Sequence, residues 1–158
     1  TPLYSSAASD VYKRQMVFGV TTAMLIAGLL HVPRRMWIGI AAMSILVPFH
    51  EDAKKRAKSR VPGNIVGCFI FLALYYLLPP SIYNYVGVIG GIGVGLSATY
   101  GCQAVFNTFG ALSIAVGILG LPGAVFFRIF NNFFGAVYGV LFERGFGRVL
   151  DRMSCNGQ

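Results

Sequence analysis

Six runs of apolar residues, separated by short polar or turn-forming segments, organise most of this sequence. The runs cover residues 16–32, 36–49, 62–78, 82–100, 104–120 and 122–142. None of them alternates apolar and polar residues as the strands of a membrane barrel do. A helix needs about 20 apolar residues, and at least about 17, to cross the hydrocarbon core, so only the second run depends on its flanking residues. The pattern predicts an all-α polytopic membrane protein with six transmembrane helices.

Proline and glycine mark the expected ends of these helices. Pro62 and Pro122 are expected at first helical positions, where the missing N–H costs no hydrogen bond. Pro79 and Pro80 are expected to stop the third helix, and Gly120 opens a tight turn between the fifth and sixth.

The composition supports a membrane protein. Charged residues make up 11% of the 158 residues and hydrophobic residues 56%, whereas a soluble domain has about 25% charged residues. So few charges could not cover a water-facing surface, and we expect a lipid bilayer around the helices. The net charge of +8 comes mostly from bases at the ends of apolar runs. That placement follows the positive-inside rule and argues against a nucleic-acid partner.

The same basic residues predict the orientation. Five lie between the second and third runs and three follow the sixth: Lys54, Lys55, Arg56, Lys58, Arg60, Arg144, Arg148 and Arg152. Both groups fall on one side of a six-helix protein, and that side is the cytoplasm. Arg34 and Arg35 lie on the other side but are outnumbered. We therefore expect a multi-pass protein of the cytoplasmic membrane with both termini in the cytoplasm.

The ends of the chain are expected to lie outside a transmembrane domain of residues 16–143. Residues 1–15 lack an initiator Met and resemble translated adapter sequence. This indicates a non-native leader on a truncated reading frame, with a short polar cytoplasmic tail as the alternative. Residues 144–158 are predicted to form a basic cytoplasmic tail.

Glycines at four-residue spacing predict close helix packing. Gly87, Gly91 and Gly95 share one face of the fourth helix, and Gly135 and Gly139 form a further pair. In lipid, such small residues let two helix backbones approach closely. The contact could lie within one subunit, or between subunits of a homo-oligomer or of a pair of halves.

A short motif occurs twice. Residues 60–67 read R-x-x-x-N-x-x-G, and residues 128–135 repeat the pattern 68 residues later. A weaker match links residues 41–46 with residues 110–115. If three runs repeat, the odd number of crossings makes the two halves inverted, which is a common transporter design. The alternative is coincidence, since Gly and Asn are favoured at helix contacts.

Arg128 is the most informative single residue. It lies six residues into the sixth run, about 9 Å along a helix axis. An arginine at that depth costs about 2–3 kcal/mol or more unless it is paired, solvated or snorkelled. No acidic residue lies inside any run to neutralise it. Arg128 therefore either snorkels to the headgroups or faces an anionic substrate.

Several polar residues in or near the runs are candidate partners of Arg128. Asn131, Asn132 and Asn107 are the proposed substrate-binding amides. The simpler interpretation for these residues, and for Thr108, is hydrogen bonding between helices.

Motifs for catalysis or cofactor binding do not occur in this sequence. It contains no H-E-x-x-H, no G-x-S-x-G and no phosphate-binding loop with GK[ST]. His31 and His50 lie in separate loops, and the three cysteines are far apart, so we expect no metal, no cofactor and no enzyme activity. His50 with Glu51 and Asp52 fits a proton relay or, more simply, a solvated loop.

Three features in chain order resemble the fusaric acid resistance (FUSC) family, also called the aromatic acid exporter superfamily. They are residues 31–37, leading into a short run that ends near Pro48, then a basic loop, then residues 60–67. The resemblance covers about residues 17–150. The family motif reads R-x-x-G-T-x-x-G, and this chain keeps Arg60, Gly63 and Gly67 but has Asn64 in place of Thr.

The resemblance implies secondary efflux of aromatic or other small organic acids from a bacterium across its inner membrane. It also places Arg128 and Gly135 in a second copy of the family motif. Family members often carry a large cytoplasmic domain or a second six-span block, and these 158 residues contain neither. The alternative is therefore a non-transporting scaffold or half-subunit that pairs with a partner carrying the missing domain.

Overall fold

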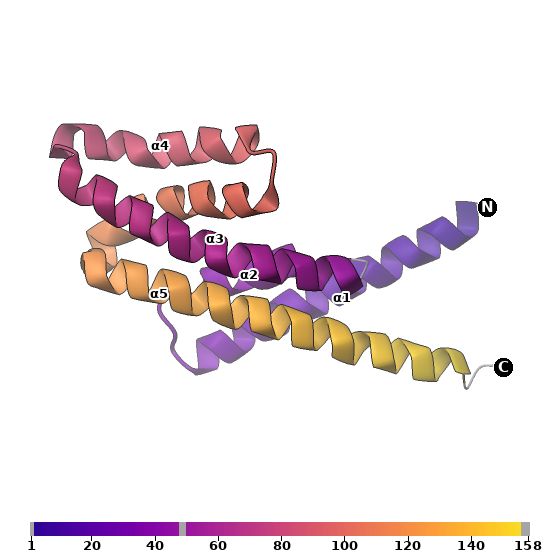
Figure 1. Cartoon of the computed structure of the whole chain (residues 1–158). Helices are drawn as coiled ribbons and strands as arrows, with labels where there is room; N and C mark the ends of the chain where they lie inside the picture. Colours follow the sequence, from indigo (N-terminus) through magenta and orange to yellow (C-terminus); the bar gives the residue numbers. More distant parts are fainter. Residues whose placement is uncertain (1, 48–49, 156–158) are drawn as a thin grey trace. The chain divides into compact units, whose positions relative to one another are not determined.

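The computed structural model describes residues 2–47 and 50–155, which form five α-helices and contain no β-strand. The helices are α1 (Pro2–Leu29), α2 (Met36–Ile45), α3 (His50–Leu77), α4 (Pro80–Leu96) and α5 (Tyr100–Cys155) (Figure 1). Gly120 has φ 68° and ψ 166°, so α5 consists of two helical stretches joined at this residue. The predicted all-α class is confirmed, and the six helical stretches follow the six apolar runs in order.

The proline positions agree with the sequence only in part. Pro62 lies inside α3, so the prediction that it occupies a first helical position is wrong. The reason is that residues 53–58 are strong helix formers and extend α3 back to His50. Pro80 lies in the first turn of α4. Pro122 follows the break at Gly120, so it lies in the first turn of the second stretch of α5.

Two helices contain segments long and apolar enough to cross a membrane. These segments are Asp52–Leu77 and Tyr100–Val149. Met36–Ile45 and Tyr85–Leu96 are apolar but shorter. The ten residues of α2 extend about 15 Å, half of a hydrocarbon core of about 30 Å. The number of crossings therefore stays a prediction.

The chain divides into two compact units. Unit 1 comprises residues 1–57 and 134–158, and unit 2 comprises residues 58–133. Unit 1 thus holds α1, α2, the first turns of α3 and the last part of α5. Unit 2 holds the remainder of α3, all of α4 and the earlier part of α5.

Unit 1 is built around small residues of α1 and α2. Its core consists of Ala23, Ala27, Ile38 and Ala42, with Val32, Phe134 and Tyr138 packed against them. A Cβ atom on Gly135 would lie 2.6 Å from the carbonyl oxygen of Ile38, and one on Gly139 would lie 3.0 Å from the Cβ of Ile45. Gly135 and Gly139 therefore lie where α5 meets α2.

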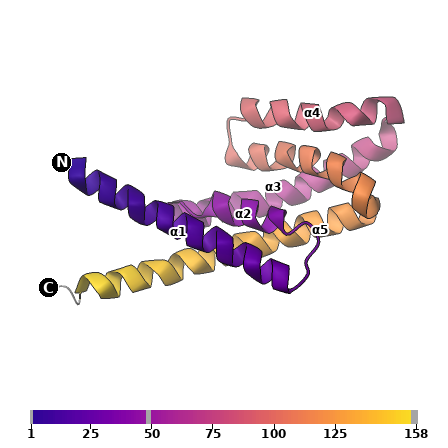
Figure 2. The same ribbon diagram turned by 180° about the vertical axis from the view of Figure 1, so that it is seen from behind.

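Helix α1 begins at Pro2 and runs without a break into the first apolar run. Tyr12 donates a hydrogen bond to the carbonyl oxygen of Leu46 at 3.2 Å, which ties this part of α1 to the end of α2. In both views the start of α1 and the end of α5 lie at the same end of unit 1 (Figures 1 and 2). The interpretations of residues 1–15 as a leader and of residues 144–158 as a tail stay predictions.

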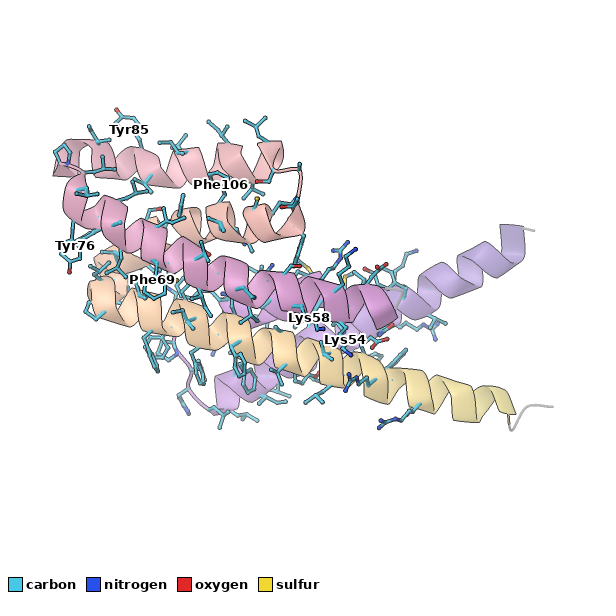
Figure 3. The ribbon with its side chains drawn as sticks, in the orientation of Figure 1. Lys54, Lys58, Phe69, Tyr76, Tyr85 and Phe106 are labelled. Carbon is cyan, nitrogen blue, oxygen red and sulfur yellow. The ribbon has the colours of Figure 1, made fainter. Side chains whose placement is uncertain are left out.

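In unit 2, α4 lies beside the first stretch of α5 (Figures 1 and 2). A Cβ atom on Gly90 would lie 2.8 Å from the carbonyl oxygen of Phe106, and one on Gly87 would lie 2.6 Å from the Oγ of Ser113. The ring of Phe106 covers Gly93 (Figure 3). Glycine is thus needed on this face of α4 for the two helices to approach so closely.

The same stretch of α5 also approaches α3 closely. A Cβ atom on Gly63 would lie 2.7 Å from the carbonyl oxygen of Gly101, and one on Gly67 would lie 2.9 Å from that of Val105. These are contacts between backbones, which cannot move aside as a flexible side chain can. Two successive turns of α3 are therefore held against α5, and this positions the polar residues between them.

Other parts of α3 and α4 present apolar surface. Phe69, Tyr76 and Tyr85 are more than 60% exposed and point outward (Figure 3). Gly91 and Gly95 have no atom within 4 Å of a Cβ position, so neither packs against another described helix of this chain. The prediction that Gly91 and Gly95 pack against a helix therefore stays a prediction, and it now concerns a helix of another chain.

Candidate functional site

Six polar side chains gather in the interior of unit 2. All are at most 4% exposed, and they are Arg60, Asn64, Thr108, Arg128, Asn131 and Asn132. They come from α3 and from both stretches of α5. We call this set the polar cluster. Buried polar groups of this number need hydrogen bonds to compensate for lost hydration, and in lipid that need is stronger.

The close approach of α3 and α5 builds the first half of the polar cluster. Thr108 donates to the amide oxygen of Asn64 at 2.8 Å, and its hydroxyl also lies 2.8 Å from the carbonyl oxygen of Ala104. The amide nitrogen of Asn64 donates to the carbonyl oxygen of Arg60 at 3.1 Å. Because Gly67 has no side chain, Thr108 can come near enough to make the first of these bonds.

Arg60 links α3 to both stretches of α5. Its Nε donates to the amide oxygen of Asn132 at 3.3 Å, and its Nη1 donates to the hydroxyl of Tyr100 at 3.0 Å. The Nη2 atom of Arg60 is buried and makes no hydrogen bond within residues 2–47 and 50–155. Asn132 in turn donates to the carbonyl oxygen of Arg128 at 2.8 Å. Arg60 and the turn that carries Arg128 are thus bridged by one asparagine.

The two copies of the repeated motif make the same local bond. In each, the asparagine donates to the carbonyl oxygen of the arginine four residues earlier. The amide oxygens differ, because that of Asn64 accepts from Thr108, whereas that of Asn132 accepts from Arg60.

The motif glycines also have corresponding contacts, each within its own unit. In unit 2, Gly67 lies against the carbonyl oxygen of Val105 and the Cβ of Thr108. In unit 1, Gly135 lies against the carbonyl oxygen of Ile38 and the Cβ of Ala41. Ala41 corresponds to Thr108 in this comparison. Unlike Thr108, it has no hydroxyl.

The charge of unit 2 is entirely positive. Residues 58–133 contain Lys58, Arg60 and Arg128 and no Asp or Glu. Lys58 is exposed at the start of this segment (Figure 3), whereas the two arginines are buried. Unit 2 therefore buries two cations and has no carboxylate of its own, and buried charges are costly in apolar surroundings unless they are compensated.

The structure brings together most of the predicted substrate-binding residues. Arg128, Asn131 and Asn132 all lie in the polar cluster, whereas Asn107 is only half-buried. Arg128 is 1% exposed, which favours the inward-facing interpretation over snorkelling. Arg60 was expected only as a family-motif residue. The motif repeat was the signal that could have pointed to Arg60, because it pairs this residue with Arg128.

Tyr100 was not expected in the site at all. It lies at the start of α5 and holds one nitrogen of Arg60. The side chains that hold Arg60 are thus an amide, from Asn132, and a hydroxyl, from Tyr100. Among the described residues, no three His, Cys, Asp or Glu side chains come together as metal ligands do.

The apolar helices and the buried cationic cluster define a helical membrane protein with a polar interior. A model of the fusaric acid resistance protein-like family matches residues 22–142, most of the chain, and the chain belongs to this family. The resemblance seen in the sequence is confirmed, and it makes membrane transport or resistance the class of function. Searches of curated proteins and of solved structures each gave no match to this chain.

Proposed function

We propose that this protein exports small organic anions, aromatic acids among them, by secondary transport. The observation that carries the proposal is the buried pair Arg60 and Arg128 in a segment without a single acidic residue. The family description also names resistance to an organic acid. Export is the form of transport that gives resistance.

The polar cluster supplies the recognition chemistry. A guanidinium group binds a carboxylate through two parallel N–H donors, and it does so more strongly away from water. Arg128 is the primary contact in this proposal, with Asn131 and Asn132 as neutral donors beside it. A bound carboxylate would offset the charge that the apolar surroundings disfavour. Neutral amides complete the site without competing for the cation, as an acidic side chain would.

The transport mechanism we propose uses six transmembrane helices arranged as two inverted repeats. Support comes from the equal asparagine bonds in the two motif copies and from the corresponding contacts of Gly67 and Gly135. In this arrangement the site lies where the repeats meet, and rocking of one repeat alternates access to it. The exposed bases Lys54, Arg144 and Arg148 support a cytoplasmic location of both termini.

Inside-out membrane vesicles provide the test, because an exporter accumulates its substrate in them. We expect vesicles with the wild-type protein to take up radiolabelled benzoate when a proton gradient is imposed. Arg128→Ala should lower uptake to the level of empty vesicles while inserting at the wild-type amount on an immunoblot. Arg144→Ala, which removes an exposed arginine, should transport normally. Normal uptake by Arg128→Ala would refute a substrate role for that residue.

A second candidate function is a scaffold or half-subunit that transports only with a partner. The open faces of Gly91 and Gly95 favour it, because a second helix could approach there. On this alternative, Gly91→Leu disrupts a complex recovered from the membrane, and the purified chain alone gives no flux. A fully active Gly91→Leu variant that stays monomeric in detergent would exclude it.

A further inference from the structure

We infer that Arg60 and Arg128 together hold a small monovalent inorganic anion, such as chloride, when no organic acid is bound. The site of this ion is the same polar cluster, and its ligands are guanidinium N–H donors. Only the competition with an organic acid rests on the proposed function. The inorganic site itself stands on the geometry and charge of unit 2.

Arg60 is held with one nitrogen left over. Asn132 accepts from its Nε and Tyr100 from its Nη1, so the plane of the guanidinium group is fixed from two sides. Nη2 is buried and makes no hydrogen bond among the described residues, and Arg60 as a whole is only 4% exposed. A buried N–H donor that is held in place but unused is costly, and an anion is the ligand that satisfies it.

Unit 2 supplies no negative charge of its own. Residues 58–133 contain no carboxylate, and the amide oxygens of Asn64 and Asn132 already accept from Thr108 and Arg60. Arg128 lies one turn before Asn132 and its charge adds to that of Arg60. Like charges in a medium of low dielectric constant repel strongly unless an ion of opposite charge lies between them.

The close packing around the polar cluster suits a small ion when no organic acid is bound. The contacts at Gly63 and Gly67 hold α3 and α5 backbone to backbone, and every member of the polar cluster is at most 4% exposed. Chloride has no preferred direction of hydrogen bonding, so in our proposal it accepts from both guanidinium groups. A carboxylate would need the same donors, so the two ligands exclude each other.

The test measures thermal unfolding of the purified full chain in a neutral detergent by its intrinsic fluorescence. Sodium chloride replaces sodium isethionate, whose anion carries no carboxylate, at constant ionic strength. We expect chloride to raise the Tm saturably by about 5 °C, because a ligand that binds only the folded state stabilises it by mass action. Arg60→Gln should abolish the saturable rise, whereas Arg148→Gln, which removes an exposed arginine, should keep it.

A second measurement covers the case in which Arg60→Gln does not fold. The ³⁵Cl line width of a chloride solution should broaden with wild-type protein and narrow again when nitrate is added. The inference is wrong if chloride gives no saturable rise and no broadening, or if Arg60→Gln responds like the wild type. Narrowing by benzoate as well as by nitrate supports a shared site. If the protein transports no benzoate but still binds chloride, only the proposed export function fails.

Discussion

Among single residues, the two motif asparagines show how one sequence pattern can serve two purposes. Asn64 uses its amide oxygen for Thr108 and so fastens α3 to α5. Asn132 uses the same atom for Arg60 and so orients a cation. The asparagine of the first copy therefore mainly serves packing, and the asparagine of the second mainly positions Arg60 in the proposed site.

Thr108→Val tests the packing role of the first copy. The change keeps the shape of the side chain but removes the donor to Asn64, so a buried amide oxygen loses its partner. We expect a loss of about 1 kcal/mol in the free energy of unfolding, measured by denaturation in mixed micelles. Thr108→Ser retains the hydroxyl and should be less affected. Equal stability of Thr108→Val and the wild type would show that this bond contributes nothing.

The sequence predicted some residues of the site better than others. A lone arginine inside an apolar run is costly, and that cost identified Arg128 and its neighbours Asn131 and Asn132. Arg60 adjoins a basic loop, where an arginine needs no special explanation. Its bond to Asn132 joins residues 72 positions apart, and no local pattern encodes a contact of that range.

At the level of helices, glycine decides which surfaces meet. Gly67 faces the backbone of α5, whereas Gly91 faces open space, although both belong to small-residue patterns of the same kind. Spacing alone cannot separate the two cases, because it fixes the face on which a residue lies but not the partner of that face.

Gly67→Ala and Gly91→Ala form a matched pair of substitutions. The added methyl group at position 67 would lie 2.9 Å from the carbonyl oxygen of Val105, so the helices must separate. We expect Gly67→Ala to destabilise the protein by about 1–3 kcal/mol. Gly91→Ala meets no atom and should be neutral or stabilising by up to about 1 kcal/mol, because alanine favours a helix. Equal thermal stabilities of the two variants in detergent would contradict this contact.

Helix boundaries were the least predictable feature of the fold. Pro62 was expected to begin a helix, yet α3 begins at His50. Charged residues that mark an interface in the hydropathy pattern are also good helix formers, and they continue a helix out of the apolar region. The order of the six stretches followed from hydropathy because each is apolar over most of its length.

For the whole molecule, α2 is the helix on which the proposed topology depends. Its ten residues are too short to span the hydrocarbon core without their flanks. The proposed topology needs this crossing, since otherwise the halves would not be inverted and the termini would not share a side.

Single cysteines on either side of α2 test the topology. Arg35 and Lys54 are both exposed, and the proposed topology places Arg35 outside and Lys54 in the cytoplasm. In a background without native cysteines, an impermeant maleimide added to intact cells should label Arg35→Cys and spare Lys54→Cys. Lysed cells, in which both should react, are the control. Labelling of both variants in intact cells would show that α2 does not cross.

The most direct test of the account is counterflow by the purified chain alone in proteoliposomes. This measurement needs no knowledge of the coupling ion, because a carrier exchanges labelled for unlabelled substrate without net transport. Proteoliposomes loaded with unlabelled benzoate should transiently accumulate external radiolabelled benzoate, and those with Arg128→Ala should not. Accumulation equal to that of protein-free liposomes, with the wild-type protein folded and inserted, would contradict the claim that this chain is itself an organic-anion transporter.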